Sequence, residues 1–298
     1  MIRISLVIAT YNRAEQLMVT LGSVAAQSLP AEVWECVVVD NNSTDSTREC
    51  VAAFSREHAG LNIVYCFEAE QGLSAARNAG IRASRGAVIA IIDDDERIND
   101  EFLAAYLELF ASRADVMVAG GRIIAEYPAG RPSWMTTFTE RPIANPMDFG
   151  ARVRVFPKGK IPGGGNMAIR REALERVGDF DTTLGRTGKR LTGGEESDLF
   201  ERMAAVGIRP YYVPRAVMYH IIPETKLTRE YFRCLSYNTG VSQRRRAELH
   251  GRVWRLYLGE AVKWCATVAL CLVHRVEQSR MLLLMRHEIT CGILQGDK

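Results

Sequence analysis

The 298-residue sequence lacks the cysteine spacing of a disulfide framework or of a structural zinc site. Its seven cysteines form no Cys-x-x-Cys pair and recur at no regular interval. Dispersed thiols of this kind are typical of a reducing compartment, in which cysteine behaves as a small hydrophobic residue. The first strand-like run begins at Ile4, with no charged leader and no small-residue cleavage site before it. We therefore expect a cytoplasmic protein.

Uninterrupted apolar runs of membrane-spanning length are also absent. The most apolar long window runs from Leu256 to Val273 and contains Glu260 and Lys263, whereas a transmembrane helix needs roughly 20 largely apolar residues. The net charge of +3 is too small to indicate a nucleic-acid partner by itself. We expect neither a membrane span nor a nucleic-acid partner.

Positive charge is concentrated in the last third of the chain. Arginine and lysine alternate there with tryptophan, tyrosine and leucine, a pattern that suits a helix lying on a membrane surface. Packing on the rest of the protein, or a homodimer contact, explains the pattern equally well. The sequence leaves the choice open between these two and peripheral membrane contact through residues 250–290, on the inner face of the cell membrane. The basic residues are Arg244, Arg245, Arg246, Arg252, Arg255, Lys263, Arg275, Arg280 and Arg286.

Two common nucleotide-binding motifs are missing. No Gly-x-Gly-x-x-Gly follows the first strand-like run, and the chain has no phosphate-binding loop ending in Gly-Lys-Ser or Gly-Lys-Thr. These absences argue against a dinucleotide-binding Rossmann domain and against a P-loop nucleotidase.

Strand and helix patterns alternate through the first 120 residues, which predicts an α/β fold with a mostly parallel, doubly wound sheet flanked by helices. Between residues 127 and 160 prolines interrupt the pattern, and we expect a long loop region with short elements. From Thr228 onward the pattern is helical. The expected strands are residues 4–9, 35–39, 62–67, 87–92, 116–119, 166–170, 211–214 and 216–220. The expected helices are residues 14–27, 46–57, 73–83, 101–112, 171–177 and 197–206.

Three adjacent carboxylates, Asp93, Asp94 and Asp95, follow the apolar run that ends at Ile92. Adjacent anions repel one another, so a fold that keeps them together supplies positive charge nearby, and oxygen ligands suit Mg2+ or Mn2+. An acidic turn that caps a helix starting near Asn99 is the alternative.

The carboxyl ends of parallel strands lie at one edge of a sheet, where α/β proteins bind ligands. Tyr11, Asp40 and Asp93 follow three such strands, and together they suit a nucleotide: a ring packs on Tyr11, Asp40 accepts from a base N–H, and Asp93 accepts from ribose hydroxyls. Arg77, one turn into the next helix, could reach the base or the diphosphate. A strand-end cap at Asp40 and a surface salt bridge at Arg77 are the alternatives.

Four ordered motifs resemble family 2 glycosyltransferases of the GT-A fold, over about residues 3–245. The resemblance implies a nucleotide-sugar donor, a divalent metal ion and inversion at the anomeric carbon. It implies nucleotide contacts for Ala9, Tyr11, Asp40 and Arg77. The matching segments are Val7 to Arg13, Val38 to Asp45, Gly72 to Gly80 and Asp93 to Asp95.

The same resemblance assigns the Asp run and a histidine to the metal and the donor. Asp93 would meet the ribose region and the metal, and Asp95 would bind the metal, although a run of three leaves the choice between Asp94 and Asp95 open. His220 would complete the metal site, but a lone histidine is more often structural. Asn166, after three glycines, would lie against the sugar, with a bare turn as the alternative.

A later acidic motif, Gly193 to Leu199, matches the family at the start of a helix. An inverting transfer needs a base for the acceptor hydroxyl, and we assign that role to Glu196, with Glu195 on the acceptor or donor sugar. The alternative is two acids in a first helical turn.

The resulting expectation is a GT-A catalytic domain over residues 1–225 and a helical C-terminal extension over 226–298. Residues 1–120 would form the nucleotide-binding half and 121–225 the acceptor half. The enzyme would move a sugar from a UDP-sugar to a saccharide or a polyprenyl-linked or other lipid-linked acceptor in surface polysaccharide synthesis. A sugar-phosphate nucleotidyltransferase and an inactive nucleotide-sugar-binding scaffold are the rival functions.

Overall fold

The computed structural model describes residues 1–188 and 192–296, and the chain divides into two compact units. The first unit is an α/β unit made of residues 1–124, 147–183 and 195–221. The second is helical and comprises residues 125–146, 184–194 and 222–298. The helical unit therefore includes two segments that precede residue 226 in the chain.

Four parallel strands form one half of the sheet in the α/β unit. Their order is β3-β2-β1-β4, so β1 lies between β2 and β4. Parallel strands need crossover connections, and helices form most of these connections here. The strands are β1 (Ile4–Thr10), β2 (Trp34–Asp40), β3 (Ile63–Phe67) and β4 (Val88–Asp93), and the helices between them are α1 (Ala14–Ala25), α2 (Thr47–Glu57) and α3 (Leu73–Ala83), with a short 3-10 turn, η1 (Ala31–Val33), before β2.

The other half of the sheet is antiparallel. It continues from β4 in the order β8-β6-β9-β5, and β7 also pairs with β9. The expected mostly parallel sheet therefore holds for the first four strands, and the complete sheet is mixed. Two strand-like pieces expected near Pro214 form a single strand, β9. The strands are β5 (Glu96–Ile98), β6 (Val118–Glu126), β7 (Arg154–Val155), β8 (Met167–Arg170) and β9 (Tyr211–Ile221).

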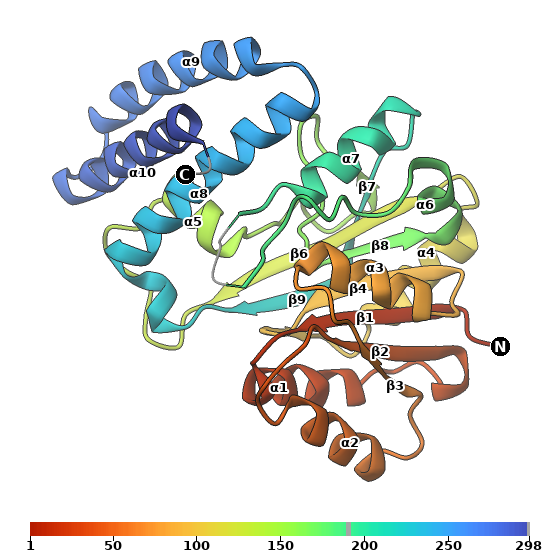
Figure 1. The fold of residues 1–298 in the computed structure, drawn as a ribbon. Coiled ribbons are helices and arrows are strands. Elements are labelled where there is room, and N and C mark those ends of the chain that lie inside the picture. Colours follow the sequence, from red (N-terminus) through yellow and green to blue (C-terminus); the bar gives the residue numbers. More distant parts are fainter. Residues whose placement is uncertain (189–191, 297–298) are drawn as a thin grey trace. The chain divides into compact units, whose positions relative to one another are not determined.

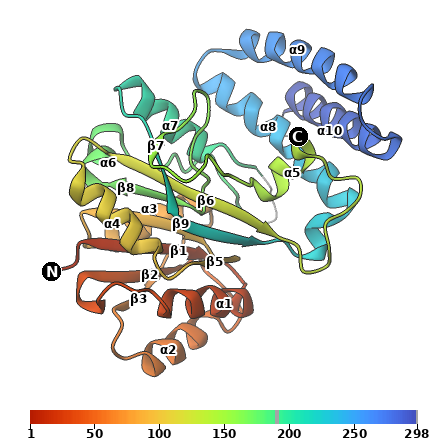
Figure 2. The same ribbon diagram turned by 180° about the vertical axis from the view of Figure 1, so that it is seen from behind.

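Helices cover both faces of the sheet because successive strand residues point to opposite sides. Leu6 and Ile8 of β1 pack with apolar residues of α1, α2 and α4 (Phe102–Ser112), whereas Val7 and Ala9 pack with those of α3, α6 (Arg171–Val177) and α7 (Glu195–Ala205). Figure 1 shows α3, α6 and α7 in front of the sheet, and Figure 2 shows α4 on the opposite side. The strands are thus buried on both faces.

The helical unit has its own core, formed by α5 and the last three helices with a short 3-10 turn, η2. Gly240 and Gly292 allow close contact of two of these helices, because a Cβ at either position would collide with a backbone carbonyl of the facing helix. Helix α5 lies in the region where the sequence predicted a long loop. The elements are α5 (Thr137–Ala144), η2 (Glu224–Leu227), α8 (Arg229–Leu249), α9 (Val253–Cys271) and α10 (Val276–Gln295).

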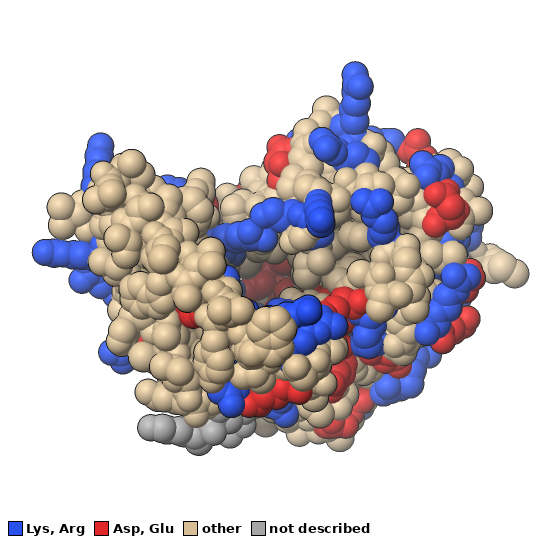
Figure 3. Space-filling model, turned by 90° about the horizontal axis from the view of Figure 1, so that it is seen from above, with Lys and Arg blue, Asp and Glu red and all other residues tan. Residues whose placement is uncertain are grey.

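The left part of Figure 3 is mostly tan, with Lys and Arg side chains along its edge. Among the described residues, no helix combines the length and the apolar composition that crossing a membrane requires.

Candidate active site

Three strand ends meet at one edge of the α/β unit, as the sequence predicted. Thr10 at the end of β1 pairs with Asp40 of β2, and Ala9 pairs with Asp93 of β4. Because β1 is central, the loops that follow β1, β2 and β4 leave the sheet side by side. Tyr11 immediately follows this edge, and its side chain is exposed.

The loops after β1 and β2 are tied to each other by hydrogen bonds. The backbone N–H of Asn12 donates to Ser43 Oγ at 3.0 Å, and Asn12 Oδ1 accepts from the backbone N–H of Thr44 at 2.7 Å. Asn12 and Asn42 both have positive φ angles, 52° and 64°, a conformation that asparagine tolerates better than most residues. These contacts fix the position of Tyr11 relative to the end of β2.

Asp40 is buried and accepts two hydrogen bonds from the protein. Tyr65 Oη donates to its Oδ2 at 2.7 Å, and the backbone N–H of Ser43 donates to its Oδ1 at 2.8 Å. Burial and the contact with Asp40 raise the pKa of Tyr65 to about 12, so the phenol stays protonated and acts as the donor. A carboxylate oxygen can accept more than one hydrogen bond, which leaves Asp40 able to accept from a ligand.

The three aspartates after β4 have different surroundings. Asp94 points into the protein, with 4% of the residue exposed, and accepts from Thr10 Oγ1 and Arg13 Nη1, both at 2.8 Å. Burial raises the pKa of Asp94 to about 6, and Arg13 opposes this shift. Asp93 keeps a third of its side chain exposed, and Asp95, whose Oδ2 lies 3.4 Å from Arg13 Nη1, a seventh. Asp94 therefore has the most buried side chain of the three.

The run of aspartates does not cap a helix. Strand β5 follows it directly, and the next helix, α4, begins only at Phe102. The alternative, an acidic turn that caps the next helix, is thus wrong, because β5, which pairs with β9, separates the aspartates from α4.

Arg77 joins the two acidic motifs. Its guanidinium is buried, and Nη2 donates to Asp93 Oδ1 at 2.9 Å. Nη1 donates to Glu196 Oε1 at 2.9 Å and lies 3.4 Å from Glu195 Oε1. Both glutamates lie in the first turn of α7, as the alternative of two acids at a helix start predicts. In addition, both contact Arg77. Arg77 Nε has no hydrogen-bond partner among the described residues.

Glu96, a residue to which the sequence analysis gave no role, is buried beside this cluster. Its Oε2 accepts from the backbone N–H of Asp93 at 2.9 Å. Burial, with Asp93 and Asp95 nearby, raises the pKa of Glu96 well above its ordinary value. In the sequence, the one indication of a role for Glu96 is its position directly after the three aspartates. His220 of β9 is the register partner of Glu96, which brings the histidine within one position of Asp95.

The glycine-rich segment lies against carboxylates of the site. A Cβ on Gly164 would collide with the Glu196 carboxylate, and a Cβ on Gly165 with that of Glu96. Asn166 is fully buried, and its amide donates to the backbone carbonyls of Arg122 and Ala216 while Tyr106 Oη donates to its Oδ1. The protein thus uses the Asn166 side chain to hold the segment, and the contact of Asn166 with a sugar stays a prediction.

The donor groups at this edge fit a divalent metal ion that also takes ligands from a substrate. Asp93 and Asp95 supply carboxylate oxygens, and Mg2+ commonly binds one or two carboxylates together with substrate phosphates. Within residues 1–188 and 192–296, no group of three or more His, Cys, Asp or Glu side chains is arranged to hold a metal ion by itself.

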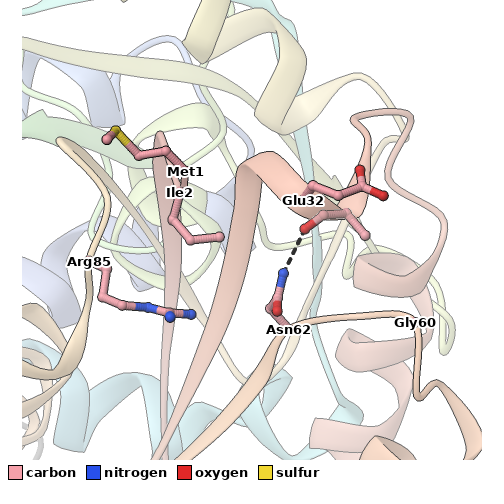
Figure 4. A pocket seen from close by; sticks show the side chains of 7 residues that line it. Met1, Ile2, Glu32, Gly60, Asn62 and Arg85 are labelled. Carbon is pink, nitrogen blue, oxygen red and sulfur yellow. Dashed lines mark hydrogen bonds between the residues drawn. The ribbon is translucent and has the colours of Figure 1, made fainter.

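A surface cavity of about 500 Å3 lies at the opposite edge of the sheet. It is lined by residues that precede β1, β2 and β3, among them Ile2, Glu32 and Asn62 (Figure 4). Asn62 Nδ2 donates there to the backbone carbonyl of Ala31 at 2.7 Å. The cavity is therefore separate from the acidic cluster at the carboxyl ends of the strands.

The fold is similar to that of solved glycosyltransferase structures. The mannosyltransferase PcManGT from Pyrobaculum calidifontis, solved in complex with GDP-Man and Mn2+, aligns with a TM-score of 0.64 at 20% identity, over 98% of this chain and 86% of its own. The S. aureus TarS fragment 1–349 in complex with UDP-GlcNAc aligns with a TM-score of 0.57 at 20% identity, over 81% and 66%. The fold is that of the GT-A glycosyltransferases.

Sequence comparison gives the family. The model of "Glycosyl transferase family 2" matches residues 5–178. The succinoglycan biosynthesis protein ExoM of Rhizobium meliloti (strain 1021) is 27% identical over 99% of this chain and 93% of its own length. The glycosyltransferase AglE of Haloferax volcanii is 31% identical over 64% of this chain and 58% of its own length. The chain belongs to glycosyl transferase family 2 and is a glycosyltransferase.

Proposed function

We propose that the enzyme transfers a sugar from a nucleoside diphosphate sugar, a UDP-sugar in the first instance, to a saccharide or a lipid-linked saccharide, with inversion at the anomeric carbon. The observation that carries this proposal is the convergence of Asp93 and Glu196 on the buried Arg77, next to the strand edge at Asp40. Two acidic groups with separate tasks are what an inverting transfer needs. Two solved structures of similar fold support a nucleotide sugar as the donor, since PcManGT was solved with GDP-Man and TarS with UDP-GlcNAc.

In this proposal the strand edge binds the donor. Tyr11 packs on the base, Asp40 accepts from a base N–H, and Asp93 accepts from the ribose. Asp93 and Asp95 would hold Mn2+ or Mg2+, with His220 close in register, and Asp94 would stay bonded to Thr10 and Arg13. The ion, when bound, would offset the charge that develops on the departing diphosphate.

Glu196 is the base of the proposed reaction. An oxygen of the acceptor hydroxyl attacks the anomeric carbon, the bond from that carbon to the diphosphate oxygen breaks, and the diphosphate leaves with the electron pair. Glu196 takes the hydroxyl proton. Arg77 orients Glu196 Oε1, and Gly164 leaves room for the carboxylate. Glu195 lies deeper and supports the same guanidinium.

The acceptor class follows from the relatives rather than from the site. ExoM is named for succinoglycan biosynthesis, and we propose a surface polysaccharide or glycolipid as the product. A lipid-linked acceptor would place the enzyme at the inner face of the cell membrane.

Titration calorimetry with UDP, GDP, CDP and dTDP, each with Mn2+ and with EDTA, tests the donor site. We expect one nucleotide to bind in a metal-dependent way. Failure of all four nucleotides to bind, with and without metal, would overturn the donor site. Binding by an enzyme that shows no turnover with the matching sugar donors would favour an inactive scaffold.

A further inference from the structure

Helix α9 exposes an unusually apolar face. Trp254, Leu258 and Val262 follow one another at intervals of four residues on the outward side, and Leu258 and Val262 are 61% and 69% exposed. Monomeric proteins seldom leave such a continuous apolar stripe in water. The exposed large hydrophobic residues in this part of the chain are Leu249, Trp254, Tyr257, Leu258, Val262, Val268, Leu272, Val273 and Val276.

The inward side of the same helix is polar where it contacts α10. Glu260 is buried and accepts from Arg286 Nη1 at 3.0 Å at both carboxylate oxygens. Thr290 Oγ1 donates to Glu260 Oε1 at 2.9 Å, and Trp264 Nε1 donates to Thr290 Oγ1 at 2.9 Å. A helix in water normally turns its apolar side inward and its charged side outward. Leu256, Leu270 and Cys271 of α9 do pack on the core of the helical unit, but the exposed side of the helix carries large apolar side chains as well, which indicates that this side contacts an apolar medium.

The charged residues near α9 distinguish between two apolar partners, a second copy of the protein and a lipid bilayer. Between residues 249 and 276 the basic residues are Arg252, Arg255, Lys263 and Arg275, and Glu260, which is buried, is the only acid. Lys263 Nζ lies 3.8 Å from the Glu260 carboxylate, whereas Arg255 lies beside the exposed Trp254. The exposed side of α9 is thus apolar and carries positive rather than negative charge. A second copy of this surface would bring like charges together, whereas anionic lipid headgroups would attract them.

Trp254 and Arg255 add a further indication. The Arg255 guanidinium lies 5.2 Å from the centre of the Trp254 ring, and Trp254 is exposed. Tryptophan beside arginine suits the boundary between headgroups and acyl chains, because the ring is apolar and its N–H is polar.

We propose that the outward side of α9 docks on an anionic lipid bilayer and lies parallel to its surface. The apolar residues from Trp254 to Val276 enter the headgroup region, and the basic residues contact lipid phosphates. This docking does not depend on the proposed transfer reaction, since lipid binding requires neither donor nor acceptor.

Flotation of the full chain with lipid vesicles tests the proposal. One set of vesicles is phosphatidylcholine alone, and the other contains phosphatidylcholine and phosphatidylglycerol in equal parts. We expect flotation with the mixed vesicles and at least about tenfold weaker binding for Leu258→Glu/Val262→Glu, because two apolar side chains are lost from the bilayer. Val206→Glu, at a similarly exposed valine outside α9, is the matched control and should float like the unsubstituted protein.

Arg255→Gln provides a second variant that leaves the apolar face and the contacts of Glu260 intact, and it should weaken the preference for phosphatidylglycerol. The absence of flotation by the unsubstituted chain, or equal flotation of all variants, would overturn the proposal.

Sedimentation equilibrium adds one more decisive outcome: a dimer that Leu258→Glu/Val262→Glu converts to monomers would assign the face to a second copy instead. Nucleotide titration of the same samples reports on the donor site separately, so failure of one proposal is distinguishable from failure of the other.

Discussion

Arg77 and Glu196 lie 119 positions apart in the chain and form a partly buried ion pair of 2.9 Å. The same guanidinium contacts Asp93 with its other terminal nitrogen, also at 2.9 Å. An acid at the end of β4 and an acid at the start of α7 are thus held by one planar group. Arg77 is 1% exposed, whereas the side chains of Asp93 and Glu196 are 34% and 22% exposed, so a buried cation holds two acids that remain accessible to a substrate.

Arg77→Lys should lower kcat by at least about tenfold. Lysine keeps the charge but presents a single ammonium, which cannot bridge Asp93 and Glu196 as the guanidinium fork does. Steady-state kinetics with the donor identified by calorimetry gives the measurement. Arg82→Lys on the exposed side of the same helix is the control and should retain full activity. An unchanged kcat in Arg77→Lys would show that the fork is not needed.

Glu196→Gln should reduce kcat by roughly 100- to 10,000-fold, the usual contribution of a general base, and leave nucleotide affinity unchanged. Glutamine keeps the shape and can still accept from Arg77, but it cannot take the acceptor proton. Glu175→Gln, on the exposed side of α6, controls for the loss of one negative charge. Turnover within a factor of two of the unsubstituted enzyme would remove Glu196 from the mechanism.

The parallel half of the fold was predictable because its signals are local. Apolar runs bounded by polar residues indicate β1 through β4, and the predicted bounds of α3 and α6 agree with the structure. The antiparallel half depends on pairings between distant segments, such as Glu96 with His220, which no local pattern encodes. For the same reason the sequence missed β5 and treated the segment around Pro214 as two pieces.

Motif positions in the candidate site were predictable, but side-chain directions were not. The sequence assigned the metal to Asp95 but left the choice between Asp94 and Asp95 open, and the short contacts of Asp94 with Thr10 and Arg13 distinguish the surroundings of the two. It also placed Asn166 against a ligand, where the structure uses its amide to hold backbone carbonyls. Directions of this kind follow from tertiary contacts that form after the local elements.

Asp95→Asn and Asp94→Asn should have different effects. If Asp95 binds the metal, Asp95→Asn should abolish the Mn2+ dependence of nucleotide binding with little change in the unfolding temperature. Asp94→Asn should instead lower the free energy of unfolding by roughly 1–3 kcal/mol, because it weakens buried hydrogen bonds to Thr10 and Arg13. Calorimetric titration and thermal unfolding of both variants give the comparison. Loss of metal dependence in Asp94→Asn alone would exchange the two roles.

Gly292→Ala should destabilise the helical unit by about 1–3 kcal/mol through overpacking. The added Cβ would collide with the carbonyl of Tyr237, and the contact between α8 and α10 would have to widen. Gly259→Ala in α9 makes the same change where no atom lies within 4 Å of the added Cβ. It should stabilise the helix by roughly 0.5–1 kcal/mol. Urea unfolding curves of the two variants should therefore shift in opposite directions, and a shift in the same direction would contradict the close packing.

Glu35→Gln should lower stability at neutral pH and leave a shallower decline in acid. Glu35 is buried on β2 and accepts from Ser5 Oγ at 2.7 Å and from the backbone N–H of Arg85 at 2.6 Å. Burial favours a higher pKa for Glu35, but these hydrogen bonds and the Arg85 guanidinium outweigh it and hold the pKa below its ordinary value. A carboxyl whose pKa is lower in the folded state stabilises the fold above its unfolded pKa, about 4.3, and this contribution is lost as pH falls through the folded value.

The difference in unfolding free energy between the unsubstituted protein and Glu35→Gln should therefore be largest at neutral pH, roughly 1–3 kcal/mol, and should narrow below about pH 4. Urea unfolding over a pH series gives this difference directly. Glu32→Gln, at an exposed position three residues earlier, controls for the change in net charge and should follow the unsubstituted protein at every pH. A difference that stays constant into acid would mean that the contribution of Glu35 to stability does not depend on the charge of its carboxyl group.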